Sequence, residues 1–437
     1  MSFLRKGLLA TSSSILCVGL GVITTMMLAR TLLPEGMGRY QLPINTVTLV
    51  VTLLSFGLGQ SSIFFLNNRK VEVKQIMTNS VWVAIFTSVL LILTMPIVLS
   101  VFADYFGFMP MWVKLTLCLG MCGSYSAALF RPILIAHLRM REAVYMQVAN
   151  SVFFLATVAL CFLGRWLTVY LAICFFSVGS IIRALLGLWF LREHLTGAYS
   201  FDFGLFKDSF RYGLKLYSAS ILNIVNTLIG VMLLRYFMRE DFTAVGYYGR
   251  ATSLCRLAAL LPMSLSPLLY AKWSGLSAEE RRGQVEMVIR MFVIVGAIII
   301  FGLAVFSHRL ILFLYGESFL PAVPVLRILV IGLALRTVLS VCNQLLASDG
   351  RAQITAYLLG ISVIVGVILT WALVPYYGIN GAAIANVLAS FTVFTIGLVI
   401  VKRLYNIRIG HMLFLKKSDF KYLLYAIKKR SVSQTSD

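Results

Sequence analysis

Residues 12–41 read SSSILCVGLGVITTMMLARTLLPEGMGRYQ, and residues 218–250 read SASILNIVNTLIGVMLLRYFMREDFTAVGYYGR. Each stretch has a serine-rich start, an Ile-Leu pair, an apolar run that ends in arginine (Arg30, Arg235), an acidic turn and a Gly-x-Tyr motif. The offset along the chain is 205 residues for the arginines and 208 for Tyr40 and Tyr248. Two similar offsets indicate a duplicated unit that occupies each half of the chain.

The composition around these two stretches is that of a membrane protein. Of the 437 residues 60% are apolar or aromatic and 12% are charged, whereas a soluble domain is about 45–50% apolar and about 25% charged. We therefore expect the chain to cross a membrane many times. Hydropathy, bounded by charges and turn residues, defines 12 windows long enough to cross a bilayer: 8–29, 42–66, 76–102, 113–136, 144–163, 167–191, 213–237, 244–270, 286–307, 324–347, 354–375 and 381–401.

Basic residues set the expected orientation. With both termini on the inner side, the inner segments hold 23 Lys and Arg and the outer ones 5, which is the asymmetry of a chain whose termini are cytoplasmic. Equivalent parts of the repeat are six spans apart and therefore share an orientation. The expected fold is all-α and integral to the membrane, with 12 transmembrane helices in two parallel-repeat six-helix bundles. Its parts are a bundle over 1–191, a cytoplasmic linker over 192–212, a bundle over 213–401 and a basic cytoplasmic tail over 402–437.

The net charge of +22 does not indicate nucleic-acid binding, because so apolar a chain has no polar face to present to it. Basic and apolar residues alternate in the tail, which predicts either a helix that lies on anionic lipid or a frayed end. The sequence also favours a protein that is not an enzyme and has no cofactor or metal. Its four histidines lie in connections without an acid or cysteine at metal or triad spacing, and no phosphate-binding loop is present.

Several arginines fall inside the predicted spans, and these are the candidate binding residues. An arginine at the bilayer centre costs about 2.5 kcal/mol or more, so it needs a watery cavity or a partner. No Asp or Glu lies deeper than the end of a span. The partner is then either a ligand that carries phosphate or pyrophosphate, or helix carbonyls with Ser and Asn side chains. The candidate pyrophosphate path consists of Arg256 and Arg336, near the middle of their spans, with Arg131, Arg183 and Arg250.

Tyrosine and amide side chains inside the spans suit the sugar part of such a ligand, because they offer hydroxyls, amides and stacking faces. The same groups also serve as polar contacts between membrane helices. The candidate sugar contacts are Tyr125, Tyr217, Asn223, Asn226 and Asn343.

The segment Ala29-Arg30-Thr31-Leu32-Leu33-Pro34-Glu35-Gly36-Met37-Gly38-Arg39-Tyr40 carries a family resemblance. It resembles the opening of the Wzx-type polysaccharide (O-antigen) flippases of the multidrug/oligosaccharidyl-lipid/polysaccharide exporter superfamily. Their pattern is Ala-Arg, an apolar pair, Gly-Pro-Glu, two residues, Gly, one residue, Tyr. Leu33 departs from it by standing where glycine is usual.

The resemblance implies a flippase of the bacterial cytoplasmic membrane. Its substrate would be an undecaprenyl-pyrophosphate-linked oligosaccharide repeat unit, moved by alternating access for surface polysaccharide synthesis, with polymerase and chain-length proteins as partners. Two alternatives belong to the same superfamily. A drug exporter would need membrane carboxylates, and a lipid II flippase usually has further C-terminal helices. A membrane polysaccharide polymerase or ligase is the alternative of another class, and it would be expected to have a large outer loop.

Overall fold

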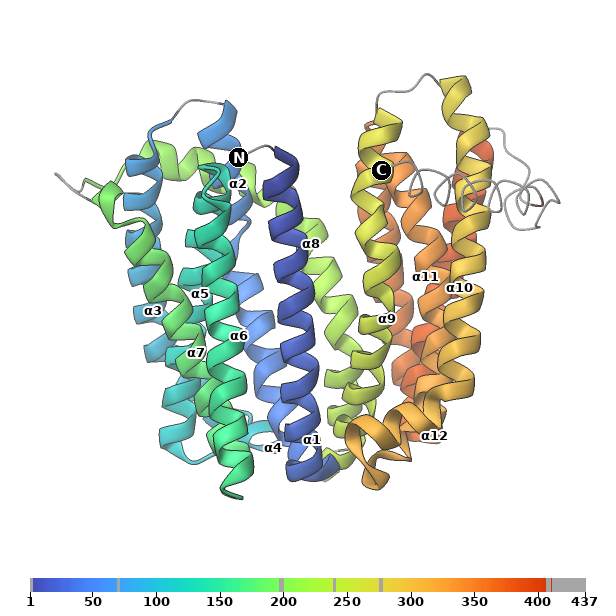
Figure 1. Cartoon of the computed structure of the whole chain (residues 1–437), viewed down its shortest axis with the longest axis horizontal. Coiled ribbons are helices and arrows are strands. Elements are labelled where there is room, and N and C mark those ends of the chain that lie inside the picture. Colours follow the sequence, from blue (N-terminus) through green and yellow to red (C-terminus); the bar gives the residue numbers. More distant parts are fainter. Residues whose placement is uncertain are drawn as a thin grey trace, which may run out of the picture. The chain divides into compact units, whose positions relative to one another are not determined.

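A computed structural model describes residues 3–68, 71–195, 200–238, 241–274, 278–405 and 410, and this part of the chain is all-helical (Figure 1). Most of the predicted basic tail lies outside these residues, including every position at which it was expected to meet lipid. The helices are α1 (Phe3–Ser55), α2 (Leu58–Asn68), α3 (Val73–Val101), α4 (Ala103–Phe106), α5 (Met111–Ala136), α6 (Met140–Leu163), α7 (Val169–Phe190), α8 (Phe203–Phe237), α9 (Phe242–Ser274), α10 (Ala278–Tyr315), α11 (Ala322–Ser348) and α12 (Ala352–Tyr405), with 3-10 turns η1 (Arg192–Leu195) and η2 (Glu317–Phe319).

Nine helical segments within the described residues are long and apolar enough to cross a membrane. The predicted all-α membrane class is confirmed, and the count of 12 spans stays a prediction. Two of the nine segments contain a backbone break at a predicted connection, at Leu33 in α1 and at Gly378 in α12. Most other helix ends lie within a few residues of the predicted ones. There are three exceptions. Helix α8 begins at Phe203 rather than at 213, and α10 extends eight residues beyond both ends of the predicted span 286–307. The predicted span 42–66 is interrupted, because α1 ends at Ser55 and α2 begins at Leu58.

The lipid-facing side of the chain is visible in the exposure of large apolar side chains. Along α3 the exposed residues recur at helical spacing, with Phe86 at 73%, Leu93 at 65% and Ile97 at 65%. The opposite face of α3 is buried and includes Met77 and Leu91. A soluble protein rarely exposes so large an apolar surface, whereas hydrocarbon chains cover it at no cost.

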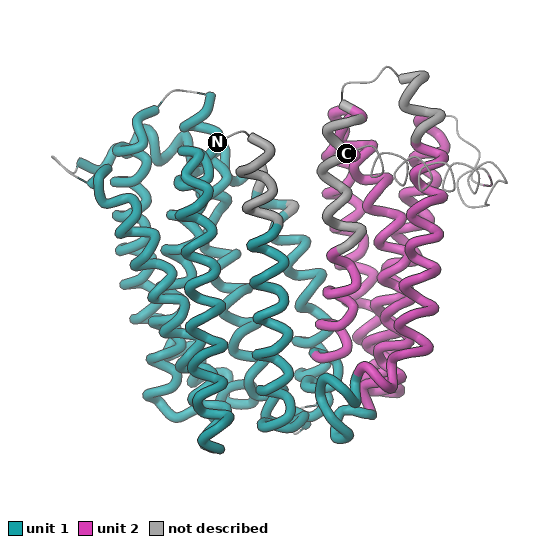
Figure 2. Tube along the Cα trace, in the orientation of Figure 1, with its two compact units in different colours: residues 1–249, 311–320 teal, residues 250–310, 321–437 magenta. Residues whose placement is uncertain are grey.

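The chain divides into two compact units, drawn in different colours in Figure 2. Unit 1 is Met1–Gly249 with Ile311–Leu320, and unit 2 is Arg250–Leu310 with Pro321–Asp437. One buried cluster in unit 1 joins α2, α3, α5, α6 and α7 around Tyr125, Phe130 and Met146. Another in unit 2 surrounds Trp273 and Phe292. These compact units are a different division from the repeat, so the bundle boundaries at 191 and 213 remain a proposal.

Leu33 has φ 58° and ψ 178°, a region that essentially only glycine occupies without strain. This conformation ends the first helix of α1 immediately before Pro34, whose ring disfavours helical geometry at the preceding residue. Its position in the motif is the one at which the resembling flippases have glycine. The backbone of this turn therefore explains the family pattern, and Leu33 retains the turn at an energetic cost.

Leu33→Gly is expected to raise the free energy of unfolding by about 1 kcal/mol. It relieves about 1–3 kcal/mol of strain and loses less than that to the greater freedom of glycine in the unfolded chain. Thermal unfolding in one detergent measures the effect, with Leu32→Gly as the matched control. Leu32 is helical, so that control should lose stability. Equal destabilisation by both changes would contradict the strain at Leu33.

Candidate functional site

The five arginines of the predicted pyrophosphate path fall in both units. Arg131 on α5 and Arg183 on α7 belong to unit 1, whereas Arg250 and Arg256 on α9 and Arg336 on α11 belong to unit 2. The side chains of Arg131 and Arg256 are exposed, Arg183 and Arg336 are half-buried, and Arg250 is buried. We consider the arginines of each unit separately.

Arg131 and Arg183 are brought together from positions far apart in the sequence. They lie close enough for their like charges to interact across the packed pair α5 and α7. The Nε atom of Arg183 is buried without a hydrogen-bond partner among the described residues, and no described carboxylate forms a salt bridge with either guanidinium. Two repelling cations without an anion make a site that a negatively charged group would stabilise.

Arg336 instead has partners supplied by the protein. Its Nε donates a hydrogen bond to Ser390 Oγ at 2.8 Å, and its Nη2 donates to Asn386 Oδ1 at 3.3 Å. Both partners lie on the second part of α12. These bonds match the alternative in which Ser and Asn side chains satisfy an arginine within the membrane.

Three of the candidate sugar contacts are engaged within the protein. Tyr125 is buried and lies close to Thr87, and the Tyr217 hydroxyl donates to the carbonyl of Leu53. Asn343 Oδ1 accepts a hydrogen bond from Thr355 at 3.4 Å. The contact role of these residues stays a prediction, as it does for Asn226 and for Asn223, whose side chain is exposed.

At the predicted outer end, the repeat-related arginines Arg30 and Arg235 make equivalent bonds. Arg30 Nη2 donates to the carbonyl of Phe313 at 2.5 Å, and Arg235 Nη2 donates to the carbonyl of Asp104. Asp104 and Phe313 are 209 residues apart, close to the offset between the two arginines. Each half of the sequence thus supplies an arginine that bonds the other half, and all four residues belong to unit 1. We call these two bonds the outer latch.

Sequence reasoning missed the outer latch. From the predicted spans we expected Arg30 in an outer connection and Arg235 near the membrane surface. A long side chain at either place ordinarily extends into water. Arg235 is in fact only 3% exposed. The signal that could have revealed the pair was their equivalence in the repeat.

A close helix crossing lies beside the outer latch, where Gly38 in α1 meets Gly246 in α9. A Cβ atom at Gly38 would lie 1.9 Å from the carbonyl oxygen of Phe242, and one at Gly246 would lie 2.0 Å from that of Pro34. Only glycine permits this approach at either position. The two glycines are the repeat-equivalent members of the Gly-x-Tyr motif, so each half contributes the same residue to the crossing.

Two arginines lie over the ring of Phe242 at this crossing. The guanidinium carbon of Arg235 is 3.7 Å from the ring centroid and that of Arg39 is 5.4 Å from it. The Phe108 ring packs edge-on against Phe242 at 5.2 Å. Each cation over a desolvated ring contributes about 0.5–2 kcal/mol. Phe242 therefore strengthens the contact between the loops that the outer latch connects.

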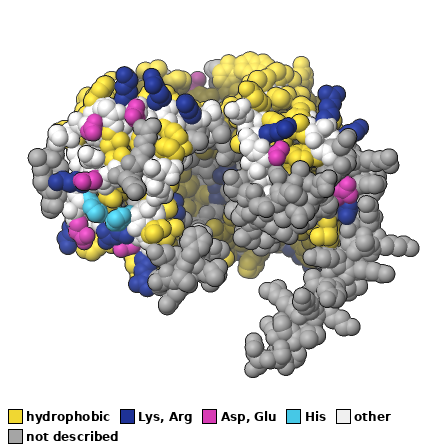
Figure 3. All heavy atoms as spheres, turned by 90° about the horizontal axis from the view of Figure 1, so that it is seen from above, with side chains coloured by type: hydrophobic (Ala, Val, Ile, Leu, Met, Phe, Trp, Pro, Cys, Tyr) yellow, Lys and Arg dark blue, Asp and Glu magenta, His cyan; other side chains and the backbone are white. Residues whose placement is uncertain are grey.

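At the predicted inner end of unit 1, charged and histidine side chains lie together on the surface seen in Figure 3. The rings of His137 and His194 meet edge-on at 5.3 Å. Arg139 forms an ion pair with Glu142 at 3.1 Å and donates to the carbonyl of Phe190 at 3.0 Å. Burial and, to a smaller extent, the nearby His137 and Arg139 lower the pKa of His194, while Glu193 acts in the opposite direction.

The lowered pKa of His194 predicts that acid weakens this end of unit 1. The unfolded chain binds more protons than the folded one between the folded pKa and about 6.5, so stability falls as the pH drops below about 6.5. The loss should stay below about 1 kcal/mol because solvent screens a partly exposed group. Unfolding at pH 7.5 and pH 5.5 measures it, and His194→Gln should flatten the dependence. An unchanged pH dependence in that variant would contradict the assignment to His194.

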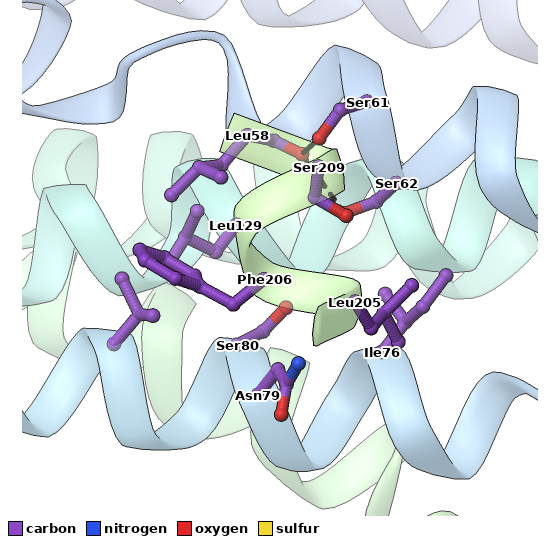
Figure 4. Close-up of a pocket in the computed structure, with 11 residues that line it drawn as sticks. Leu58, Ser61, Ser62, Ile76, Asn79, Ser80, Leu129, Leu205, Phe206 and Ser209 are labelled. Atoms are coloured by element: carbon purple, nitrogen blue, oxygen red, sulfur yellow. Dashed lines mark hydrogen bonds between the residues drawn. The ribbon is translucent and has the colours of Figure 1, made fainter. Parts of the chain in front are cut away.

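A small cavity of about 20 Å³ lies where the start of α8 passes α2 and α3 (Figure 4). Asn79 of α3 reaches the residue that caps α8, since its amide donates to the carbonyl of Asp202 and its oxygen accepts from the Asp202 N–H, both at 2.9 Å. Ser61, Ser62 and Ser209 face the same space. The cavity has room for about one water molecule, so it is too small for a substrate. The Asn79–Asp202 hydrogen bonds beside it hold the predicted linker against α3.

Comparison with known proteins decides the family. The model of the family described as polysaccharide biosynthesis protein matches residues 3–271, more than half of the chain. The chain belongs to this family. The lipopolysaccharide biosynthesis protein WzxC of Escherichia coli K12 is 22% identical over 354 residues, which cover 78% of this chain and 69% of WzxC. The teichuronic acid biosynthesis protein TuaB of Bacillus subtilis is 26% identical over 43% of this chain and 42% of TuaB.

Solved structures show the same fold at low sequence identity. The lipid II flippase MurJ in an inward closed conformation superposes with a TM-score of 0.77 at 15% identity, covering 90% of this chain and 87% of MurJ. The family match and the relatives confirm the resemblance to Wzx-type flippases of the exporter superfamily, and the solved structure confirms the exporter fold. The chain is therefore a multi-pass membrane protein of the polysaccharide biosynthesis protein family, and it shares its fold with a lipid II flippase and a multidrug resistance transporter.

Proposed function

We propose that this protein translocates an undecaprenyl-pyrophosphate-linked oligosaccharide across the bacterial cytoplasmic membrane, for synthesis of a surface polysaccharide. Its family supports the substrate class. The observation that supports a pyrophosphate-linked lipid as substrate is the pair Arg131 and Arg183. A pyrophosphate would supply the negative charge that the described protein does not place beside these two cations. The planar guanidinium groups can each bind such oxygens in pairs. Arg250, Arg256 and Arg336 would form the rest of the path.

Alternating access is the mechanism that the outer latch supports. The bonds of Arg30 and Arg235 join the two halves of the repeat at the predicted outer end, and the crossing at Gly38 and Gly246 leaves no room between them. Opening this end requires both bonds to break. A closed packing held by a few hydrogen bonds and cation–π contacts can be bistable, which is what alternating access requires.

The orientation and location proposed here follow from the sequence. The excess of basic residues in the predicted inner segments supports cytoplasmic termini, and the basic tail would then lie on anionic lipid. A polymerase and a chain-length protein would act on the product outside. The predicted spans hold no deep carboxylate for cation coupling, which disfavours the drug exporter.

The test is transport by the purified protein in proteoliposomes. Undecaprenyl-pyrophosphate carrying a fluorescent oligosaccharide is added to one leaflet, and an impermeant quencher measures its appearance in the other. We expect transfer of this lipid to be faster than in protein-free liposomes. Transfer of lipid II but not of the oligosaccharide lipid would favour a lipid II flippase. Lipid-dependent growth of the glycan chain would instead identify a polymerase.

A further inference from the structure

An open cavity of about 540 Å³ lies beside the Leu33 turn, at the predicted outer end of unit 1. Its polar wall consists of Glu35, Arg39, Thr243, Tyr247 and Ser318. The backbone turn of α1 and Val169 at the start of α7 supply the apolar part. A volume in the range of about 300–1,000 Å³ with a few convergent polar groups is typical of a site for a small organic ligand.

The chemistry of the wall suits a saccharide better than an anion. Arg39 Nη2 bonds Glu35 Oε1 at 2.6 Å, so the two charges compensate each other, yet the side chains remain 38% and 57% exposed. A carboxylate and a guanidinium together accept from and donate to neighbouring sugar hydroxyls. A phosphate group in this cavity, as distinct from the one proposed beside Arg131 and Arg183, would be repelled by Glu35. The hydroxyls of Thr243 and Ser318 add two groups that can both donate and accept.

An aromatic side chain supplies the stacking surface that sugar rings use. Tyr247 lines the cavity, and its ring meets Phe319 edge-on with centroids 6.1 Å apart. This contact fixes the Tyr247 ring against η2, the turn that also carries Ser318. Tyrosine combines an apolar face with a hydroxyl, so one residue can both stack on a pyranose and bond it.

The cavity shares its wall with the contacts that hold the outer end together. Arg39 borders it and also lies over the Phe242 ring, while the helix of Phe313, which Arg30 bonds, leads into the turn that carries Ser318. We infer that this outer cavity is a saccharide-binding site, which receives the sugar part of the translocated lipid at the outer face. This inference rests on the proposed function and names a second point at which the glycan is held.

The test measures binding of a sugar without its lipid. The probe is the oligosaccharide repeat unit released by mild acid from the host's surface polysaccharide, followed by saturation-transfer NMR on the protein in nanodiscs. Glu35→Gln is expected to weaken binding about tenfold, since hydrogen bonds to a charged group are lost. Glu317→Gln is the matched control, because Glu317 is an exposed acid next to Ser318 in η2 and does not line the cavity. It should bind as the unchanged protein does.

A second variant avoids disturbing the Glu35–Arg39 pair. Ser318→Trp places an indole ring in the cavity and should abolish oligosaccharide binding by obstructing the sugar, while leaving the ion pair intact. Undecaprenyl pyrophosphate without sugar separates this inference from the proposed function, since Arg183→Ala should weaken its binding and Glu35→Gln should not. Unaltered oligosaccharide binding in Ser318→Trp and Glu35→Gln would overturn the saccharide site. Displacement of the oligosaccharide by inorganic phosphate would also overturn it and indicate an anion site.

Discussion

Arg183→Ala is expected to reduce transport of the lipid-linked oligosaccharide about 100-fold, because a charge-assisted pair of hydrogen bonds to pyrophosphate is worth a few kcal/mol. Arg183 is the candidate with the clearest need for a ligand, since its Nε is buried without a partner in the described part of the chain and its near neighbour is another cation, Arg131. Surface polysaccharide in a deletion strain and the proteoliposome assay both measure the effect. Protein level in the membrane is recorded alongside.

Two variants control this prediction. Arg183→Lys should retain part of the activity, because an ammonium keeps the charge and loses the paired geometry of the guanidinium. Arg192→Ala removes a neighbouring arginine that lies outside the span, exposed and stacked on Trp189 at 5.2 Å, and should transport normally. If Arg183 only fills space, alanine should be tolerated and should even stabilise the protein by removing an unpaired charge. Normal transport by Arg183→Ala would therefore exclude the pyrophosphate role.

Hydropathy predicted the helices well and their interruptions less well. The predicted spans coincide with most helices because the bilayer requires runs of apolar residues that composition alone reveals. The break at Leu33 could be placed from Pro34 and from the family pattern, but its backbone angles could not. The early start of α8 at Phe203 was also missed. Its first turns are amphipathic and held by contacts such as Asn79 with Asp202, which a hydropathy window does not detect.

The candidate site shows what depth in the membrane can and cannot predict. Three of the five arginines selected by depth are at least partly buried, Arg183, Arg250 and Arg336, whereas Arg131 and Arg256 are exposed. Depth could not distinguish Arg336, which Ser390 and Asn386 satisfy, from Arg183, which lies beside Arg131. That distinction depends on which helix faces meet, and a single sequence does not contain it. The same limit hid the reciprocal bonds of Arg30 and Arg235.

Gly38→Leu is expected to prevent the outer end from closing and to lower transport at least about tenfold. Any side chain at this position meets the carbonyl of Phe242 at 1.9 Å, and backbone on both sides leaves no flexible group to yield. Overpacking of this kind costs about 1–3 kcal/mol or more, which shifts the closed population by about tenfold or more. The separated helices would also pull Arg30 and Arg235 away from the carbonyls that they bond across the repeat.

The measurement pairs transport with access to a buried position beside the crossing. Ala244, which is 2% exposed, is replaced by cysteine (Ala244→Cys) and labelled with a membrane-impermeant maleimide. Labelling of the native cysteines is measured in the protein without this change and subtracted. Labelling from the outside should be slow in the otherwise unchanged protein and fast when Gly38→Leu is added. Gly21→Leu is the matched control, because Gly21 also lies in α1, before the break at Leu33, and no neighbouring atom stands within 4 Å of its Cβ position. It should alter neither the labelling rate nor the transport rate.

The crossing is built from repeat-equivalent glycines, so Gly246→Leu must reproduce the Gly38→Leu result. Transport that survives either change would show that the closed outer end is not a step of the cycle.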